Sequence, residues 1–217
     1  GGGGWIHFCI KIKKKIIILF FLKKKHKQKP QKQKGGGGID GIKKIIGKNG
    51  RIFFGSFPSE IRPEFISTES IQILRKYTDS QTLIIGGQSG SNDLLRRIHR
   101  GHTREHVFSA VELALSTGFK VAVDYIFGLP GENEEDQQET ISSIKQLVRV
   151  GAKIHAHYFL PLPGTQLSNA HPTPISLSLR RFLGKMARDG HLFGQWQAQE
   201  VIASKIKNDS FSLKLFS

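Results

Sequence analysis

Residues 123–136 read VDYIFGLPGENEED: a short apolar run, a turn of Gly, Pro and Gly, and then a cluster of acids. An apolar run that ends at glycine is typical of a buried strand, and glycine with proline marks the turn that follows it. Acids after the turn favour a helix start, where the helix dipole stabilises negative charge. The stretch therefore predicts a strand, a tight turn and a helix, which is the repeating unit of a parallel α/β sheet.

The same alternation continues on both sides of this stretch. We expect strands at 51–57, 82–86, 120–127 and 153–160, and helices at 68–77, 92–99, 103–117 and 134–150. Strands and helices that alternate at this spacing indicate βαβ units on a parallel sheet. Four strands are too few for a closed eight-stranded barrel, so we expect an α/β fold with an open sheet.

The carboxyl ends of the expected strands are where chemistry should be found, because parallel α/β folds bind ligands there. Each strand runs into Gly or Pro mixed with small or polar residues, where the backbone can approach a ligand closely. The four ends read GSFP at 55–58, GQSGS at 87–91, GLPGE at 128–132 and PLPGT at 161–165. Four such ends in register predict a shared cavity.

The net charge of +16 is concentrated at the start of the chain. Residues 1–38 hold 11 lysines and no acids, whereas the remaining residues hold 22 basic and 17 acidic side chains. We expect 1–38 to be a disordered, low-complexity segment. Two alternatives stay open: a lysine-rich arm that binds nucleic acid non-specifically, and a decayed stretch of coding sequence.

Residues 39–203 then form the expected folded domain and 204–217 a C-terminal tail. The apolar run Ile16–Leu22 has seven residues, far from the roughly 20 that span a membrane, so no membrane partner is expected. One cysteine, Cys9, excludes an internal disulfide framework. Without disulfides or a cleavable signal pattern, a cytoplasmic location is expected.

Two segments between the expected strands at 82–86 and 120–127 carry polar groups that could bind a ligand. Gln88 and Ser89 offer an amide and a hydroxyl that could bond a ribose or a carboxylate, although Ser91 in the same loop could simply cap the next helix. Arg100 follows 12 residues after Gln88, where a helix could return it to the strand ends and present its guanidinium to a carboxylate.

Asp124 and two histidines are the ionisable groups inside expected strands. A carboxylate such as Asp124 is costly to bury unless it is hydrogen-bonded, so it either bonds neighbouring backbone or binds a ligand hydroxyl. His155 and His157 are two apart and share a face of their strand. This spacing suits a metal, but with no third acid or cysteine nearby we favour a pair of histidines satisfied within the fold.

Together these motifs resemble the second half of a radical S-adenosylmethionine (SAM) core domain, over about Gly50 to Ala203. The resemblance lies in the order and spacing of IGGQSGSNDLLRRIHRGHT at 85–103, VDYIFGLPGENEED and HAHYFLPLPGT at 155–165. The first two are similar to strand-four and strand-five motifs of methylthiotransferases. The whole stretch is most similar to a group, largely archaeal, in which a cobalamin-binding domain precedes the radical core.

The resemblance implies a partial (βα) barrel of the radical SAM type. Members bind a [4Fe–4S] cluster whose open iron is chelated by SAM, and cleavage of SAM yields a 5′-deoxyadenosyl radical that abstracts hydrogen from the substrate, so the expected partners are a small-molecule cofactor and an unknown substrate. By the same resemblance Arg100 pairs with the methionine carboxylate, Gln88 is the polar residue at the end of strand four, and Asp124 bonds the ribose hydroxyls. Ile126 and Gly128 match the motif whose backbone packs by the adenine, and Glu132 closes the turn.

The chain departs from the family pattern in one decisive respect. The cysteine motif C-x-x-x-C-x-x-C, which supplies three thiolates to the cluster, is absent, and Cys9 stands alone. The expected strands correspond to strands three to six, with the first two missing or replaced. We therefore interpret the chain as a fragment of a radical SAM enzyme that is inactive by itself; the alternative is a non-catalytic module that binds SAM or nucleic acid.

Overall fold

The computed structural model describes residues 5–12, 15–22, 44, 50–55, 60–162 and 164–214, with the backbone alone for 5–12, 15–22 and 207–214. The chain divides into two compact units, residues 1–85 with 109–121 and residues 86–108 with 122–217. Among the described elements, those at 82–88, 104–116 and 120–127 run from one unit into the other.

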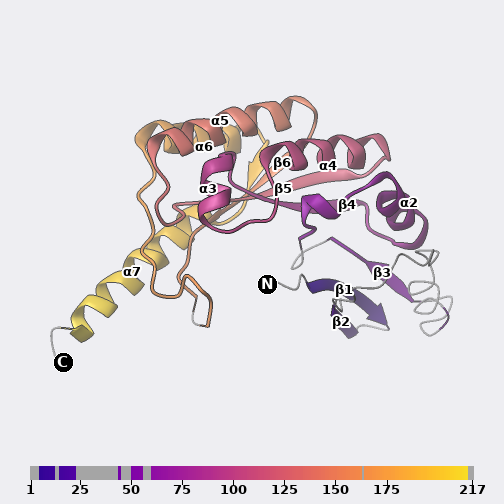
Figure 1. Cartoon of the computed structure of the whole chain (residues 1–217), viewed down its shortest axis with the longest axis horizontal. Helices are drawn as coiled ribbons and strands as arrows, with labels where there is room; N and C mark the ends of the chain where they lie inside the picture. Colours follow the sequence, from indigo (N-terminus) through magenta and orange to yellow (C-terminus); the bar gives the residue numbers. More distant parts are fainter. Residues whose placement is uncertain are drawn as a thin grey trace. The chain divides into compact units, whose positions relative to one another are not determined.

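The first unit contains an antiparallel sheet of three strands in the order β2-β1-β3 (Figure 1). It consists of β1 (Trp5–Ile12), β2 (Lys15–Leu22) and β3 (Arg51–Phe53). Aromatic and β-branched residues in WIHFCIKI and KIIILFFL favour strands. The other residues of 1–38 lie outside the described part, and the disorder expected for 1–38 stays a prediction.

The remainder of the first unit is built around α2 (Thr68–Tyr77), which matches the helix expected at 68–77. A short 3-10 helix, η1 (Pro63–Phe65), precedes it. Ser67 caps α2 by accepting a hydrogen bond from the Ser70 N–H at 3.1 Å, and the Ser70 hydroxyl accepts from the Ser67 N–H at 2.8 Å. This reciprocal pair satisfies two backbone donors that a helix start otherwise leaves open.

A second sheet of four strands has the order β4-β5-β6-β7: β4 (Thr82–Gln88), β5 (Lys120–Phe127), β6 (Lys153–Tyr158) and β7 (Leu192–Phe193). β5, β6 and β7 are parallel. The α/β class and the partial barrel are confirmed. One detail is corrected: the expected strand at 51–57 shortens to β3 and pairs with β1, and β7 is the fourth strand instead.

Helices of the second unit are α3 (Asn92–Arg97), α5 (Glu134–Arg149), α6 (Leu177–Arg188) and α7 (Trp196–Lys214), and α4 (Arg104–Ser116) begins in it. α5 packs on β6 and on α6, and the two helices lie side by side along the sheet (Figure 1). α7 packs on β6 and continues past residue 204, where we placed the start of a tail. The division into 1–38, 39–203 and 204–217 stays a prediction.

The core of the second unit lies between β5, β6 and the helices that cover them. Its fully buried side chains include Tyr125, Phe127, Ile144, Leu147 and Ile154. The Tyr125 hydroxyl lies 2.7 Å from Ser143 Oγ on α5, and burial raises the pKa of Tyr125 to about 12. This phenol therefore stays protonated and joins the sheet to α5.

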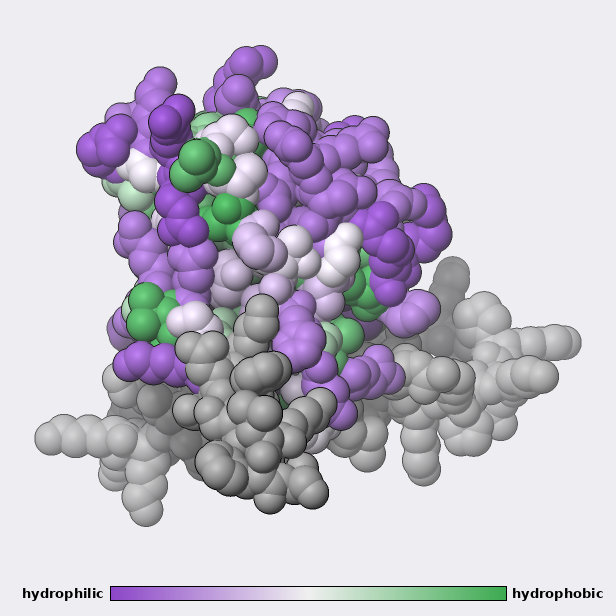
Figure 2. All heavy atoms as spheres, turned by 90° about the vertical axis from the view of Figure 1, so that its left-hand side faces the viewer, coloured by the Kyte–Doolittle hydropathy of each residue, from purple (hydrophilic) through white to green (hydrophobic). Residues whose placement is uncertain are grey.

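The face of the molecule drawn in Figure 2 is largely polar. Figure 2 shows one face, on which hydrophobic side chains form small, separate patches among hydrophilic ones. Among the described residues, every helix is either too short or too polar to cross a bilayer.

The loop after β4 approaches α5 so closely that it depends on a glycine. A Cβ atom at Gly90 would lie 2.5 Å from Thr140 Cα and 2.8 Å from the Glu139 carbonyl oxygen. The Gly90 N–H also donates a hydrogen bond to Thr140 Oγ1 at 3.0 Å. Since helix backbone cannot yield as a flexible side chain does, a methyl group here must push the loop away from α5.

We expect Gly90→Ala to lower the free energy of unfolding by about 1–3 kcal/mol, the usual cost of overpacking. Gly184→Ala on α6 is the matched control, because its Cβ would meet only Arg188 Nη1 at 3.8 Å. That change should stabilise the protein by about 0.5–1 kcal/mol, as alanine favours a helix over glycine. Urea unfolding of both variants measures the contrast, and equal effects would contradict the close approach.

Candidate functional site

The carboxyl ends of β4 and β5 are joined by the buried carboxylate of Asp136. This side chain is 3% exposed, and it accepts hydrogen bonds from Ser91 Oγ at 2.6 Å and from the Asn133 N–H at 2.9 Å. It also forms an ion pair with Arg97 of α3. Ser91 caps α3 by accepting from the Leu94 N–H at 3.3 Å, which confirms the capping alternative for this serine.

The turn after β5 is closed by Glu132. Its Oε2 accepts a hydrogen bond from the Gly128 N–H at 2.8 Å, in agreement with the structural role expected for this acid. Gly128 has a φ of 72°, and a Cβ there would lie 2.6 Å from the Tyr158 ring. Burial raises the pKa of Glu132 from 4.5 to about 7, although the Gly128 hydrogen bond opposes this rise.

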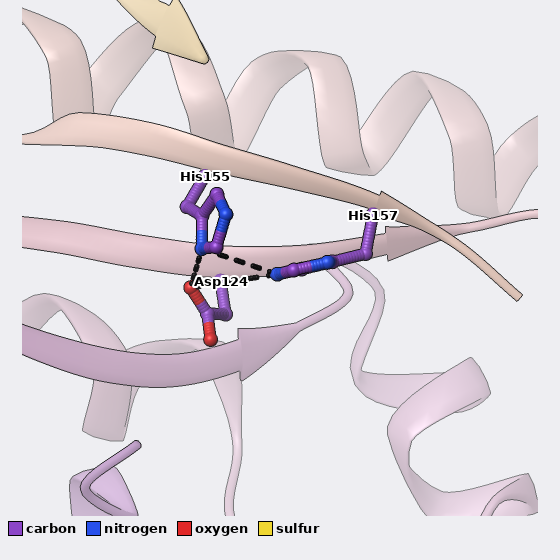
Figure 3. Close-up of side chains that lie close together, drawn as sticks. All are labelled: Asp124, His155 and His157. Atoms are coloured by element: carbon purple, nitrogen blue, oxygen red, sulfur yellow. Dashed lines mark hydrogen bonds and ion pairs between the residues drawn. The ribbon is translucent and has the colours of Figure 1, made fainter. Parts of the chain in front are cut away.

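Asp124, His155 and His157 meet between β5 and β6 (Figure 3). Asp124 Oδ1 lies 2.9 Å from His155 Nδ1 and 3.9 Å from His157 Nε2, and the two ring nitrogens are 3.1 Å apart. In the sheet Asp124 is the direct partner of His155, so the strand register sets the first of these contacts. The three side chains are 15%, 14% and 26% exposed, which leaves the cluster mostly but not wholly shielded from water.

A cavity of about 860 Å³ lies at the carboxyl ends of β5 and β6, beside this cluster. Among the described residues, two of the four strand ends that were expected to share a cavity line it, 128–132 and 161–165, and it lies where parallel α/β folds usually bind ligands. His157 belongs both to the cluster and to the cavity wall. The wall is mainly apolar, with a few polar groups, and includes Ile98, Ile126, Pro130, Tyr158, Phe159, Leu167 and Gln199.

The six residues expected to bind a cofactor occupy different positions around these features. Among residues that the structure describes, Ile126 is the one of the six that lines the cavity. Asp124 lies in the neighbouring cluster, and Gly128 lies in the turn against Tyr158. The other three residues lie in or after the β4–α3 segment.

Gln88 is buried at the end of β4 with a φ of 66°, a conformation that is uncommon outside glycine. Ser89 is 1% exposed, and its hydroxyl lies 3.3 Å from Thr140 Oγ1 and accepts from the Ser91 N–H at 3.1 Å. Ser89 thus has a packing role against α5. Arg100 is half-buried just beyond α3.

Comparison with known proteins identifies the family. The model of the radical SAM superfamily matches residues 14–144, and the chain belongs to this superfamily. The match begins well upstream of Gly50, where we placed the start of the resemblance.

Among relatives, the chain is 30% identical over 128 residues to the uncharacterized protein MJ1620 of Methanocaldococcus jannaschii, covering 58% of this chain and 25% of that protein. It is 31% identical over 134 residues to the tRNA-2-methylthio-N(6)-dimethylallyladenosine synthase of Pelobacter propionicus, covering 59% and 27%. The heme chaperone HemW of Bacillus subtilis is 30% identical over 112 residues, covering 49% and 29%. The chain spans about a quarter of the length of these relatives.

Two solved structures share the fold. Coproporphyrinogen III oxidase (HemN) of Escherichia coli, a radical SAM enzyme, superposes with a TM-score of 0.53 at 20% identity, covering 70% of this chain and 37% of that one. Elp3 of Methanocaldococcus infernus superposes with a TM-score of 0.50 at 21% identity, covering 63% and 34%. These likenesses support the partial barrel.

The family implies SAM and a [4Fe–4S] cluster, and the two groups fit this chain differently. Such clusters are held by cysteine thiolates, and the chain has one cysteine, Cys9. Its own residues therefore do not fit a [4Fe–4S] cluster. For SAM, in contrast, the cavity has the volume of ordinary small-molecule sites, about 300–1,000 Å³, and a carboxylate lies beside it.

We expect Glu132→Gln to change how stability depends on pH, because glutamine keeps an oxygen for the Gly128 N–H and cannot ionise. With its pKa raised to about 7, folded Glu132 retains a proton that the unfolded chain releases above about pH 4.5. Its stabilising contribution is thus complete below the unfolded pKa and is lost as pH rises through about 7.

Relative to the variant, the natural chain should lose about 3 kcal/mol of unfolding free energy between pH 4 and pH 8, from the conversion of about 1.4 kcal/mol per pKa unit. Urea unfolding at the two pH values measures this difference. Glu135→Gln, at an exposed acid of the same helix start, is the control and should change little. Parallel pH curves for the natural chain and Glu132→Gln would contradict the raised pKa.

Proposed function

We propose that this chain forms the SAM-binding part of a radical SAM core, made of strands β4 to β6 and the cavity at the carboxyl ends of β5 and β6. The observation that carries the proposal is the placement of the Asp124 carboxylate on β5 beside an 860 Å³ cavity that Ile126 lines. Family membership supports SAM as the ligand.

The chemistry of the residues suits the parts of SAM. A carboxylate can accept two hydroxyl hydrogen bonds, so Asp124 is assigned to the ribose. The apolar wall at Ile126, with the side-chain-free Gly128 next to it, is assigned to the adenine, and the Arg100 guanidinium to the methionine carboxylate. Gln88 and Ser89 complete the proposed set at the end of β4.

In the intact family, SAM bound to a reduced [4Fe–4S] cluster supplies a 5′-deoxyadenosyl radical. The residues of this chain would bind SAM, orient it and exclude water from it, while the cluster requires thiolates that the chain does not contain. A cobalamin domain, the cytoplasmic location and nucleic-acid binding through 1–38 all stay predictions about the whole protein, whose substrate is not assigned.

Calorimetric titration of the full 217-residue chain with SAM tests this proposal. Asp124→Asn should weaken binding about 10- to 100-fold, because hydrogen bonds to a charged group contribute about 1.5–3 kcal/mol. Arg100→Gln should weaken binding by a similar factor. Asp189→Asn, at the C-terminal end of α6, is the matched control and should leave the Kd unchanged.

Two outcomes would contradict the proposal. Heat of SAM binding that is the same in Asp124→Asn as in the natural chain would remove the assigned ribose contact. Absence of SAM binding by the natural chain would remove the proposed function as a whole.

A further inference from the structure

The three side chains between β5 and β6 form a constellation that the proposed SAM site does not explain. We propose that Asp124, His155 and His157 bind one divalent transition-metal ion of the Zn²⁺ class. This proposal goes beyond SAM binding and does not rest on it, because His155 and His157 take no part in the assigned SAM contacts.

The geometry of the three atoms suits a single ion. Asp124 Oδ1, His155 Nδ1 and His157 Nε2 are separated by 2.9, 3.1 and 3.9 Å. A triangle with these sides has a central point about 2.0 Å from every corner, close to the bond lengths of Zn²⁺ to nitrogen and carboxylate oxygen. An ion at this point is therefore within bonding distance of all three ligand atoms.

A single proton on His155 cannot give each of the three facing atoms a hydrogen bond of its own. If the proton of neutral His155 is on Nδ1, two acceptors, Asp124 Oδ1 and His157 Nε2, must share it. If His155 carries its proton on the other nitrogen, the Nδ1 lone pair faces the carboxylate directly. A cation at the centre instead contacts a lone pair of every ligand, and neutral imidazoles with a carboxylate are the ligands that such ions take.

The surroundings hold the rings in place and leave one side accessible. The His155 ring stacks on Phe193 of β7, with centroids 4.7 Å apart and planes 12° apart. It also meets the His157 ring edge-on at 4.1 Å. Because His157 lines the cavity, an ion at the cluster could take a fourth ligand, such as water or a substrate atom, from the cavity. Three protein ligands with one open position are typical of catalytic zinc sites.

The ligand types select the class of ion. Two imidazoles and one carboxylate suit Zn²⁺, Co²⁺ or Fe²⁺, whereas Mg²⁺ and Ca²⁺ prefer oxygen ligands throughout. A metal ion at the cluster and the ribose of SAM would not compete for the same oxygen of Asp124. One oxygen of Asp124 faces the histidines, and in Figure 3 the other oxygen points away from both rings.

The test is titration of the full chain with Co²⁺, followed by its visible absorption, and with Zn²⁺ in competition, without SAM. We expect one tight site with nitrogen and oxygen ligation. Absorption from thiolate-to-cobalt charge transfer would instead place the ion on Cys9 and overturn the proposal.

His157→Gln and the isosteric Asp124→Asn should each weaken Co²⁺ binding by about 100-fold or more, since changes even outside the ligand shell cost about 10–100-fold. His171→Gln, at an exposed histidine outside the cluster, is the matched control and should bind as the natural chain does. Circular dichroism checks that each variant is folded.

Unchanged Co²⁺ affinity in folded His157→Gln, or no tight site in the natural chain, would overturn the proposal. The SAM proposal can be judged separately with Arg100→Gln, which should weaken SAM binding and leave the Co²⁺ affinity as it is, because Arg100 is not one of the three proposed ligands. Loss of SAM binding in the natural chain would in turn leave the Co²⁺ result unaffected.

Discussion

The second unit depends on one buried carboxylate. Asp136 is almost inaccessible to water, and it joins three parts of the chain: Ser91 after β4, Asn133 after β5, and Arg97 on α3. A buried charge without partners is strongly unfavourable, so these groups must stay together for the unit to fold. In this way Asp136 holds the carboxyl ends of β4 and β5 side by side.

The position of α5 follows from the same interaction. The acids at its start are stabilised by the helix dipole, but the third of them, Asp136, is turned inward and also completes the cap with Asn133. Thr140, one turn further along α5, accepts a hydrogen bond from the Gly90 N–H. These contacts hold the start of α5 against the loop after β4, and α5 also packs on β6.

Much of this fold could be predicted from the sequence, because the spacing of hydrophobic residues and the residues that cap helices are local signals. β5 and α5 lie where the apolar run and the acidic helix start placed them. β7 is only two residues long and is too short to show a period. β3 pairs with β1, while Gly55 and Ile61 further along the chain bond β4, and local pattern does not encode this long-range choice.

The candidate site was harder to predict for the same reason. A metal was disfavoured at His155 and His157 because no third ligand lay nearby in the sequence, yet Asp124 reaches His155 from 31 residues away through the sheet register. Ser89, which stays in the proposed SAM set, also packs against α5, because Gly90 allows the loop to approach the helix. The spacing of strands and helices along the sequence could not reveal that the loop after β4 turns toward α5.

The pairing of Asp124 with His155 across β5 and β6 links formation of the cluster to folding of these strands. The two residues can meet only after the chain has left β5, crossed through α5 and returned as β6, so the cluster forms only when this βαβ unit is complete. Contacts so distant in sequence form late and close a large loop. Any ligand held at the cluster adds its binding free energy to the stability of this one unit, and local opening of β6 releases the ligand.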